Sequence, residues 1–396
     1  MKILLKHIAI SAPVSLLAIV FNILLFAPPE YHVSFGDPDY AYLINSLMLA
    51  EGYAPNHTDH PGTTVQTIGA LVIRIAHAFF HSSQGIVDAV LENSYFYVKS
   101  ISLGLAAILA TSCLWLGIVL CRAGYSWWVV PATQILFFLL PTSLFFLTRV
   151  CPEILLLSVA LWIGTILINN GSHRLTLKSS VLIGVALGFG LATKYTFLPL
   201  LLLLLLAGSW RALAAGTLAL VGSFLMFTLP IWPHYHTAFR WIWRVAWHQG
   251  VYGSGEPGFF PSIEILQQHL IVLWNSCRIY FDLLLLIPIA FTLWSFNKKN
   301  DRSTTLPFQL LAGSLVLLLQ LAMVLKHVGD RYLIPALAVW FWLLPSILQQ
   351  LKGNRARFLF LALYFLVAIN TLSNSLTFQR MIYNSYPEAV RRIKLF

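Results

Sequence analysis

Acidic side chains are scarce in this chain and gather in one short polar stretch. The chain has 14 Asp and Glu residues among 396, and residues 31–62 contain Asp37, Asp39, Glu51 and Asp59. The same stretch, YHVSFGDPDYAYLINSLMLAEGYAPNHTDHPG, also contains three histidines. Carboxylates and imidazoles are common general acids and bases in enzymes. Their concentration here predicts acid–base chemistry in this stretch.

Asp37 and Asp39 are both candidate general bases, and the residues alone do not separate them. The run 40–51 that follows has the apolar spacing of a helix, and the dipole at its start would keep a nearby carboxylate ionised. Asp39 is also well placed to cap that helix, which is a structural role. With Glu153, the two aspartates could instead hold Mg²⁺ or Mn²⁺, because these ions prefer carboxylate oxygens.

Asp59 and His60 flank a turn before Pro61, and their plainest role is turn chemistry. Their place in the acidic stretch also makes them, with Glu153, candidates for a pocket that binds the accepting substrate of a group transfer. The four cysteines form neither a CxxC pair nor a spacing typical of zinc ligands.

The elements that position these residues are membrane helices. The chain is 58% hydrophobic and 10% charged, with a mean hydropathy of +0.78, whereas soluble domains are about 45–50% apolar and about 25% charged. Runs such as LPLLLLLLLA at 198–207 lack the alternation of a barrel strand. We therefore expect an all-α polytopic membrane protein that forms a single domain over residues 1–396.

A membrane-spanning helix needs about 20 apolar residues. By this criterion we expect about eleven spans, at 8–27, 97–120, 127–148, 153–169, 179–193, 195–209, 212–231, 271–295, 307–325, 332–350 and 357–373. The two spans within 179–209 are short and could be broken or tilted. We expect interfacial helices at 40–51 and 63–80, with a further span as the alternative for 63–80, and another in the Trp-rich run after residue 232.

The basic residues of the short loops predict the orientation. One set of span ends carries Lys2, Lys6, Arg122, Arg174, Lys178, Arg211, Lys298, Lys299, Arg302, Lys352, Arg355 and Arg357. This face is expected to be cytoplasmic. The loops 28–96 and 232–270 and the tail 374–396 then lie outside the cell membrane, which we take to be a bacterial inner membrane.

Several cations break this rule, because they stand at the external ends of spans. Charges near a bilayer are costly and are usually functional, and the phosphate of a lipid carrier at headgroup depth would require cationic partners. Ordinary anionic headgroups are the alternative ligand. The candidate phosphate-binding residues are Arg149, Lys194, Lys326, His327, Arg331 and Tyr332.

Five short motifs give the chain a resemblance to a known superfamily. They are GDPDY at 36–40, DHPGTT at 59–64, RVCPEILLL at 149–157, GLATKYTFLPLLLL at 190–203 and KHVGDRYLIPALAV at 326–339. In this order the motifs resemble the GT-C superfamily of integral-membrane glycosyltransferases, in particular the family of protein O-mannosyltransferases and lipid A aminoarabinose transferases. The chain differs in having DPD where many relatives have Asp-Glu and HPG where many have HPP.

The resemblance implies a GT-C-like helical bundle and an inverting transfer of a sugar from a polyprenyl phosphate or diphosphate. An Asp of the first external loop would act as the base, and the outer cations would hold the carrier phosphate. The acceptor would be a lipid, a glycan or a protein, membrane lipids would surround the bundle, and no nucleic acid is expected as a partner. The alternatives are a flippase or transporter of lipid-linked oligosaccharides and an O-antigen ligase-like transferase.

Overall fold

The computed structural model describes residues 2–26, 39–59, 61–138, 141–171, 174–296, 306–351, 355, 357–367 and 369. Across these residues the chain is helical, with two isolated bridges and no strand. The expected external tail at 374–396 lies outside them. An all-helical membrane protein, as predicted from composition, is therefore confirmed for the described part of the chain.

Helix α8 (Pro152–Asn170) forms the centre of the bundle. It packs against α5 (Ser94–Arg122), α9 (Leu177–Thr193) and α15 (Leu337–Gln350). Its sequence is apolar on every side, and nearly all of its residues are buried. A helix without a polar face belongs in the interior of a bundle, which explains why this segment is enclosed by its neighbours.

Helices α9 and α10 (Trp210–Thr228) approach each other closely through glycines. A Cβ added at Gly184 would lie 2.1 Å from the carbonyl oxygen of Gly216, and one added at Gly188 would lie 2.3 Å from that of Leu220. Small residues four apart let two helix backbones come together in a membrane, where packing replaces the hydrophobic effect. A larger side chain at either position would separate the two helices.

Eight helices in the described residues are long and apolar enough to cross a membrane. They cover Ile3–Leu25, Thr63–Phe80, Ser94–Arg122, Pro152–Asn170, Trp210–Trp247, Arg278–Phe296, Leu306–Lys326 and Asp330–Gln349. Four shorter apolar helices, Val129–Phe138, Leu177–Thr193, Tyr195–Leu206 and Arg357–Val367, account for other expected spans. Helix α3 (Thr63–Phe80) thus has the length and hydropathy of a span, which was the alternative to an interfacial helix.

Several expected spans are interrupted. The segment 127–148 is divided into α6 (Val129–Gln134), η2 (Ile135–Phe138) and α7 (Pro141–Leu147). The 3₁₀ segments η3 (Tyr195–Leu206) and η6 (Asp330–Ala336) each contain a proline, which removes a helical hydrogen-bond donor. The segment 271–295 is wrong at its start, because α12 (Ile263–Ser276) ends there and α13 (Arg278–Phe296) begins after Cys277.

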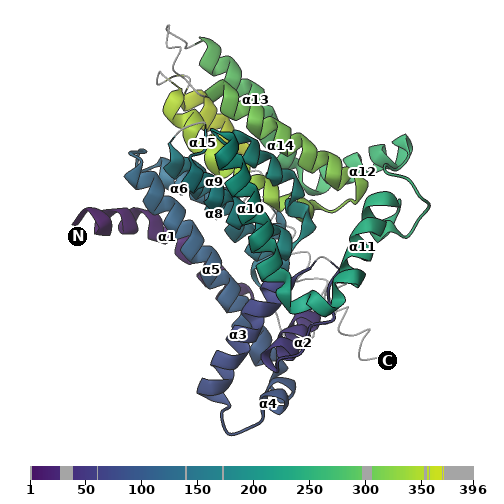
Figure 1. Ribbon diagram of the computed structural model, residues 1–396. Helices are drawn as coiled ribbons and strands as arrows, with labels where there is room; N and C mark the ends of the chain where they lie inside the picture. The colour runs from purple at the N-terminus through teal and green to yellow at the C-terminus, as the bar shows by residue number, and fades with distance from the viewer. Residues whose placement is uncertain are drawn as a thin grey trace.

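Two groups of helices project from this central bundle (Figure 1). Helices α2 (Asp39–Ala50), α3 and α4 (Ile86–Glu92) lie at one end of the molecule, opposite α13 and α15. Helices α11 (Tyr235–Trp247) and α12 lie to one side, where η4 (Leu229–His234) connects α11 to α10. Helix α1 (Lys2–Leu25) packs along α5, and α14 (Leu306–Lys326) packs on α13 and α15.

Candidate active site

The short segment that leads into α8 links two buried ion pairs. In the first, Arg149 Nε lies 3.1 Å from Asp39 Oδ2, and the Val150 N–H donates to Asp39 Oδ1 at 2.6 Å. The side chains of Arg149 and Asp39 are only 3% and 1% exposed. Asp39 therefore attaches the first turn of α2 to the turn before α8.

Glu153 forms the second pair from the first turn of α8. Lys194 Nζ lies 2.6 Å from Glu153 Oε1, and Arg331 Nε lies 3.9 Å from the same oxygen. Pro152 begins the helix, where a missing N–H costs nothing, and an acidic residue in the first turn interacts favourably with the helix dipole. Two cations from distant parts of the chain thus converge on one buried carboxylate.

Tyr332 completes this cluster. Lys194 Nζ lies 5.0 Å from the centre of the Tyr332 ring, and the Arg331 guanidinium carbon lies 5.3 Å from it. The carboxylate of Asp330 accepts the backbone N–H of Arg331 at 2.7 Å. Arg331 has the most accessible side chain of the two ion pairs, with 23% exposed. It is therefore the cation best placed to contact a ligand that approaches from outside the cluster.

Lys194 is positioned by the break between two helices. The residue ends α9 in extended conformation, and its N–H donates to Gly190 O. Just before it, the hydroxyls of Thr193 and Thr64 lie 2.8 Å apart, and Thr63 Oγ1 donates to Ala192 O at 3.4 Å. The start of α3 is thereby joined to the end of α9. All five motif segments consequently contribute residues to one region of the fold.

Three amides that the sequence analysis did not single out hold this region together. Gln320 of α14 donates to the carbonyls of Thr196 and Tyr332, at 3.1 and 2.7 Å. Asn45 Oδ1 accepts the N–H groups of Asn56 and His57 at 2.8 and 2.9 Å, and Gln66 donates to His57 O at 2.8 Å. Polar residues inside apolar helices could have indicated these positions, since such residues are usually conserved for function or packing.

Lys326 and His327 contact a different element. Lys326 donates to the carbonyl of Ala246 and lies 4.8 Å from the ring centre of Phe259. His327 Nε2 lies 3.0 Å from Val245 O. Burial lowers the pKa of His327, and neighbouring Lys326 acts in the same direction, while the Val245 carbonyl opposes the shift. These two residues hold the end of α11 against the end of α14.

The remaining candidates lie at the surface or outside the described residues. Asp59 is 46% exposed and lies 3.5 Å from His57 Nδ1, as expected for a residue in a surface turn. The structure does not describe Asp37 or His60. Arg278 and Asp282 lie 3.8 Å apart on α13, and their spacing of four residues on one helix makes them a structural pair.

The described carboxylates do not fit the predicted Mg²⁺ or Mn²⁺ site. Among the residues placed by the structure, no three His, Cys, Asp or Glu side chains are grouped closely enough to bind one metal ion. Asp39 and Glu153 instead interact with Arg149 and Lys194. Because Asp37 is the remaining ligand of that prediction, a metal ion stays a hypothesis, and no step below uses one.

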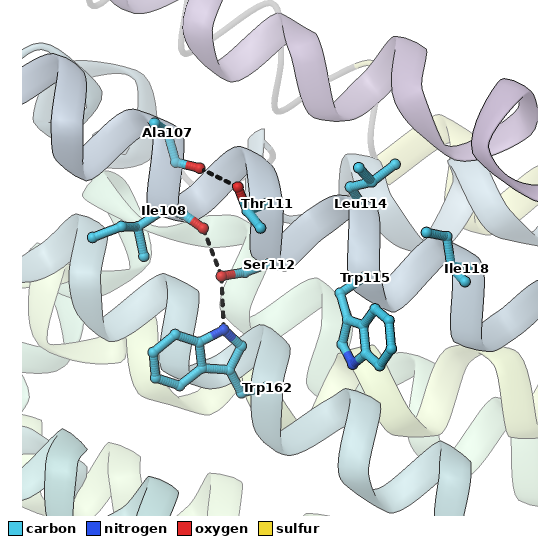
Figure 2. Close-up of a pocket in the computed structure, with 8 residues that line it drawn as sticks. All are labelled: Ala107, Ile108, Thr111, Ser112, Leu114, Trp115, Ile118 and Trp162. Atoms are coloured by element: carbon cyan, nitrogen blue, oxygen red, sulfur yellow. Dashed lines mark hydrogen bonds between the residues drawn. The ribbon is translucent and has the colours of Figure 1, made fainter.

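An apolar groove of about 460 Å³ lies apart from the ion pairs, along α5 where it faces α8 (Figure 2). Trp162 Nε1 donates to Ser112 Oγ at 2.7 Å, and Ser112 in turn donates to Ile108 O. The side-chain polar groups of Thr111, Ser112 and Trp162 are therefore satisfied within the groove. The residues that line it are Ala107, Ile108, Thr111, Ser112, Leu114, Trp115, Ile118 and Trp162, none of which the sequence analysis selected.

Fold and cluster together define an all-helical, multi-pass membrane protein with a buried set of paired charges where α2, α8, η3 and η6 meet. Among solved structures, the chain is similar to ArnT from Cupriavidus metallidurans, crystallised with undecaprenyl phosphate. The TM-score is 0.50 and the sequence identity is 13%.

The likeness covers 90% of this chain and 62% of the ArnT chain, so this chain spans less than two thirds of the ArnT length. No protein-family model and no curated protein matches the sequence. The likeness shows a shared fold.

Proposed function

We propose that this protein is an inverting glycosyltransferase that moves a sugar from a polyprenyl phosphate or diphosphate to an acceptor. The observation that carries the proposal is the convergence of Lys194 and Arg331 on Glu153, in the same segment that positions Asp39. A fold shared with a protein crystallised with undecaprenyl phosphate supports a lipid carrier as partner.

The cations would act on the leaving group. As the bond between the anomeric carbon and the phosphate oxygen breaks, its electron pair stays with that oxygen, and negative charge grows there. Preorganised cations stabilise such developing charge most effectively in a site that excludes water. Arg331 is partly exposed and Lys194 lies behind it on the buried Glu153. An arriving phosphate would therefore meet Arg331 first and share Lys194 with Glu153.

An aspartate of the first external loop would take the proton. The acceptor oxygen attacks the anomeric carbon from the face opposite the phosphate, so the configuration inverts and the aspartate accepts the acceptor's proton. Asp39 is held by Arg149 and Val150, which suits a residue that positions the loop. Asp37 and Asp39 both stay candidates for the base, and Asp39 also has a structural role.

The other partners and the location follow from the same proposal. The acceptor is a lipid, a glycan or a protein, for which Asp59, His60 and Glu153 are pocket candidates. With the orientation that the positive-inside pattern predicts, the site would lie on the external side of a bacterial inner membrane. Lys326 and His327 would support the site through α11, since both bind its backbone carbonyls.

A transfer assay tests the proposal. The purified protein is supplied with polyprenyl phosphates that carry radiolabelled sugars, with a lipid and glycan extract as acceptor. We expect label to move to the extract, and we expect Arg331→Met to reduce the transfer while Arg240→Met, a change of an exposed arginine on α11, leaves it intact. Absence of transfer from every donor would refute the proposal. Movement of the intact carrier across vesicles without sugar transfer would favour a flippase.

A further inference from the structure

Tyr252 has an unusual backbone conformation. It has φ 53° and ψ 31°, and among the residues that the structure describes it is the only one other than glycine with positive φ. This left-handed region is unfavourable for a bulky residue, and such outliers are concentrated at functional sites. Gly250 and Gly253 on either side adopt φ of 76° and 71°. A third glycine would suit the turn better, so the tyrosine ring itself needs an explanation.

The ring of Tyr252 continues a row of aromatic side chains. Its centre lies 6.3 Å from that of Trp241, at an interplanar angle of 36°, and Trp241 is stacked on Tyr195 at 6.4 Å and 26°. We call these three residues the aromatic strip. Its members come from the loop after α11, from α11 and from the start of η3. Tyr195 directly follows Lys194, so the strip begins beside the cationic cluster.

The strip differs from the outer surface of α11. Phe239, Trp243 and Trp247 are spaced four residues apart and are all exposed, so they form one stripe along the helix. Trp241 is two residues from Phe239 and from Trp243, which places it on the opposite side of α11, where it meets Tyr195. The outer stripe suits a lipid interface, so Trp241 lies on the side of α11 that faces away from that interface.

The loop that carries Tyr252 is firmly held. Gln249 N donates to Glu256 O at 3.0 Å, and Gly258 N donates to Trp247 O at 2.8 Å. A Cβ at Gly253 would lie 2.5 Å from Arg244 O, so the loop packs directly on the α11 backbone. The tyrosine ring is therefore presented by a closed turn.

We propose that the aromatic strip receives the sugar ring of the lipid-linked donor. The C–H groups of a pyranose carry slight positive charge and pack on the negative faces of aromatic rings, whose quadrupole favours such contacts. Tyr252 is 49% exposed and can offer a ring face. The link between the strip and a phosphate held at Lys194 and Arg331 is Tyr195, the residue directly after Lys194. The inference rests on the proposed function and assigns a substrate group to part of that site.

Binding measurements on Tyr252 variants test the inference. Microscale thermophoresis in detergent would compare undecaprenyl phosphate with undecaprenyl phosphate carrying a hexose or pentose, using the sugar that the wild-type protein binds most tightly. We expect Tyr252→Gly to bind the sugar-bearing lipid about 3- to 10-fold more weakly than the wild type, as for loss of one aromatic contact. Affinity for undecaprenyl phosphate should not change, and Tyr252→Phe should bind like wild type.

The glycine variant also separates binding from folding. Glycine relieves the left-handed strain, so its melting temperature should equal or exceed that of the wild type. Trp243→Leu, on the outer stripe, is the matched control and should bind both lipids normally. An equal loss of affinity for both lipids would show that the strip contacts the isoprenoid chain and would overturn the inference. Unchanged affinity for both lipids would overturn it as well. A wild-type protein that fails to bind undecaprenyl phosphate would refute the proposed function first, and the strip with it.

Discussion

Replacement of Glu153 by glutamine tests the electrostatic core of the site. The change keeps the size of the side chain and removes its charge, so Lys194 and Arg331 lose their shared anion. At 2.6 and 3.9 Å, the two attractions amount to about 6 and 4 kcal/mol at an effective dielectric constant of about 20. Desolvation offsets most of this, and removal of one partner of a buried pair typically costs about 3–5 kcal/mol. We expect a loss of this size in the free energy of unfolding.

Thermal unfolding in detergent provides the assay, with Lys194→Met and the double variant completing a cycle. The double variant removes both buried charges, so it should be more stable than Glu153→Gln alone, with a coupling of about 1–3 kcal/mol. Undecaprenyl phosphate should raise the melting temperature of Glu153→Gln more than that of the wild type, because the lipid supplies the missing negative charge. Additive losses, or a Glu153→Gln protein as stable as the wild type, would refute the reasoning.

Three further predictions concern the acids, pH and metal ions. Asp39→Asn should lower both the melting temperature and the transfer rate, because it breaks the Arg149 pair, whereas Asp37→Asn should lower only the rate if Asp37 is the base; equal stability losses would contradict this. The lowered pKa of His327 means that the folded protein binds fewer protons than the unfolded chain. Stability should therefore be lost as the pH falls below about 6.5 and through the lower folded-state pKa. The difference in melting temperature between about pH 7.5 and about pH 5.5 should be smaller in His327→Gln than in the wild type. Transfer should persist in EDTA, because Asp39 and Glu153 already pair with cations; activity that EDTA abolishes and Mg²⁺ restores would establish the metal hypothesis.

Hydropathy predicted the long helices because a span has to be apolar along its full length. Helices such as α5 and α8 begin and end within a few residues of the expected bounds. Hydropathy could not predict where the helices are interrupted. The expected span at 271–295 runs across Cys277, where two helices meet without a proline or glycine to mark the break. Hydropathy also could not decide the role of α3, which is both amphipathic and long enough to span.

The site could be predicted as a set of segments but not as pairs of residues. The motifs indicated which segments belong together, and the structure brings residues of all five into one region. Which carboxylate meets which cation depends on the packing of distant helices, so the pairing of Asp39 with Arg149 and of Glu153 with Lys194 was not predictable. The contacts of Lys326 and His327 with α11 were not predictable for the same reason, and their role at the phosphate stays a prediction.

The affinity of the Arg331→Met variant for undecaprenyl phosphate tests the central claim most directly. Glu153 keeps its pair with Lys194 in this variant, so the fold should persist. Loss of one charge-assisted contact to a phosphate is worth about 1.5–3 kcal/mol, and we therefore predict roughly 10- to 150-fold weaker binding. Arg240→Met should bind like the wild type. Unchanged affinity in Arg331→Met would contradict the proposal that this cluster holds the carrier phosphate.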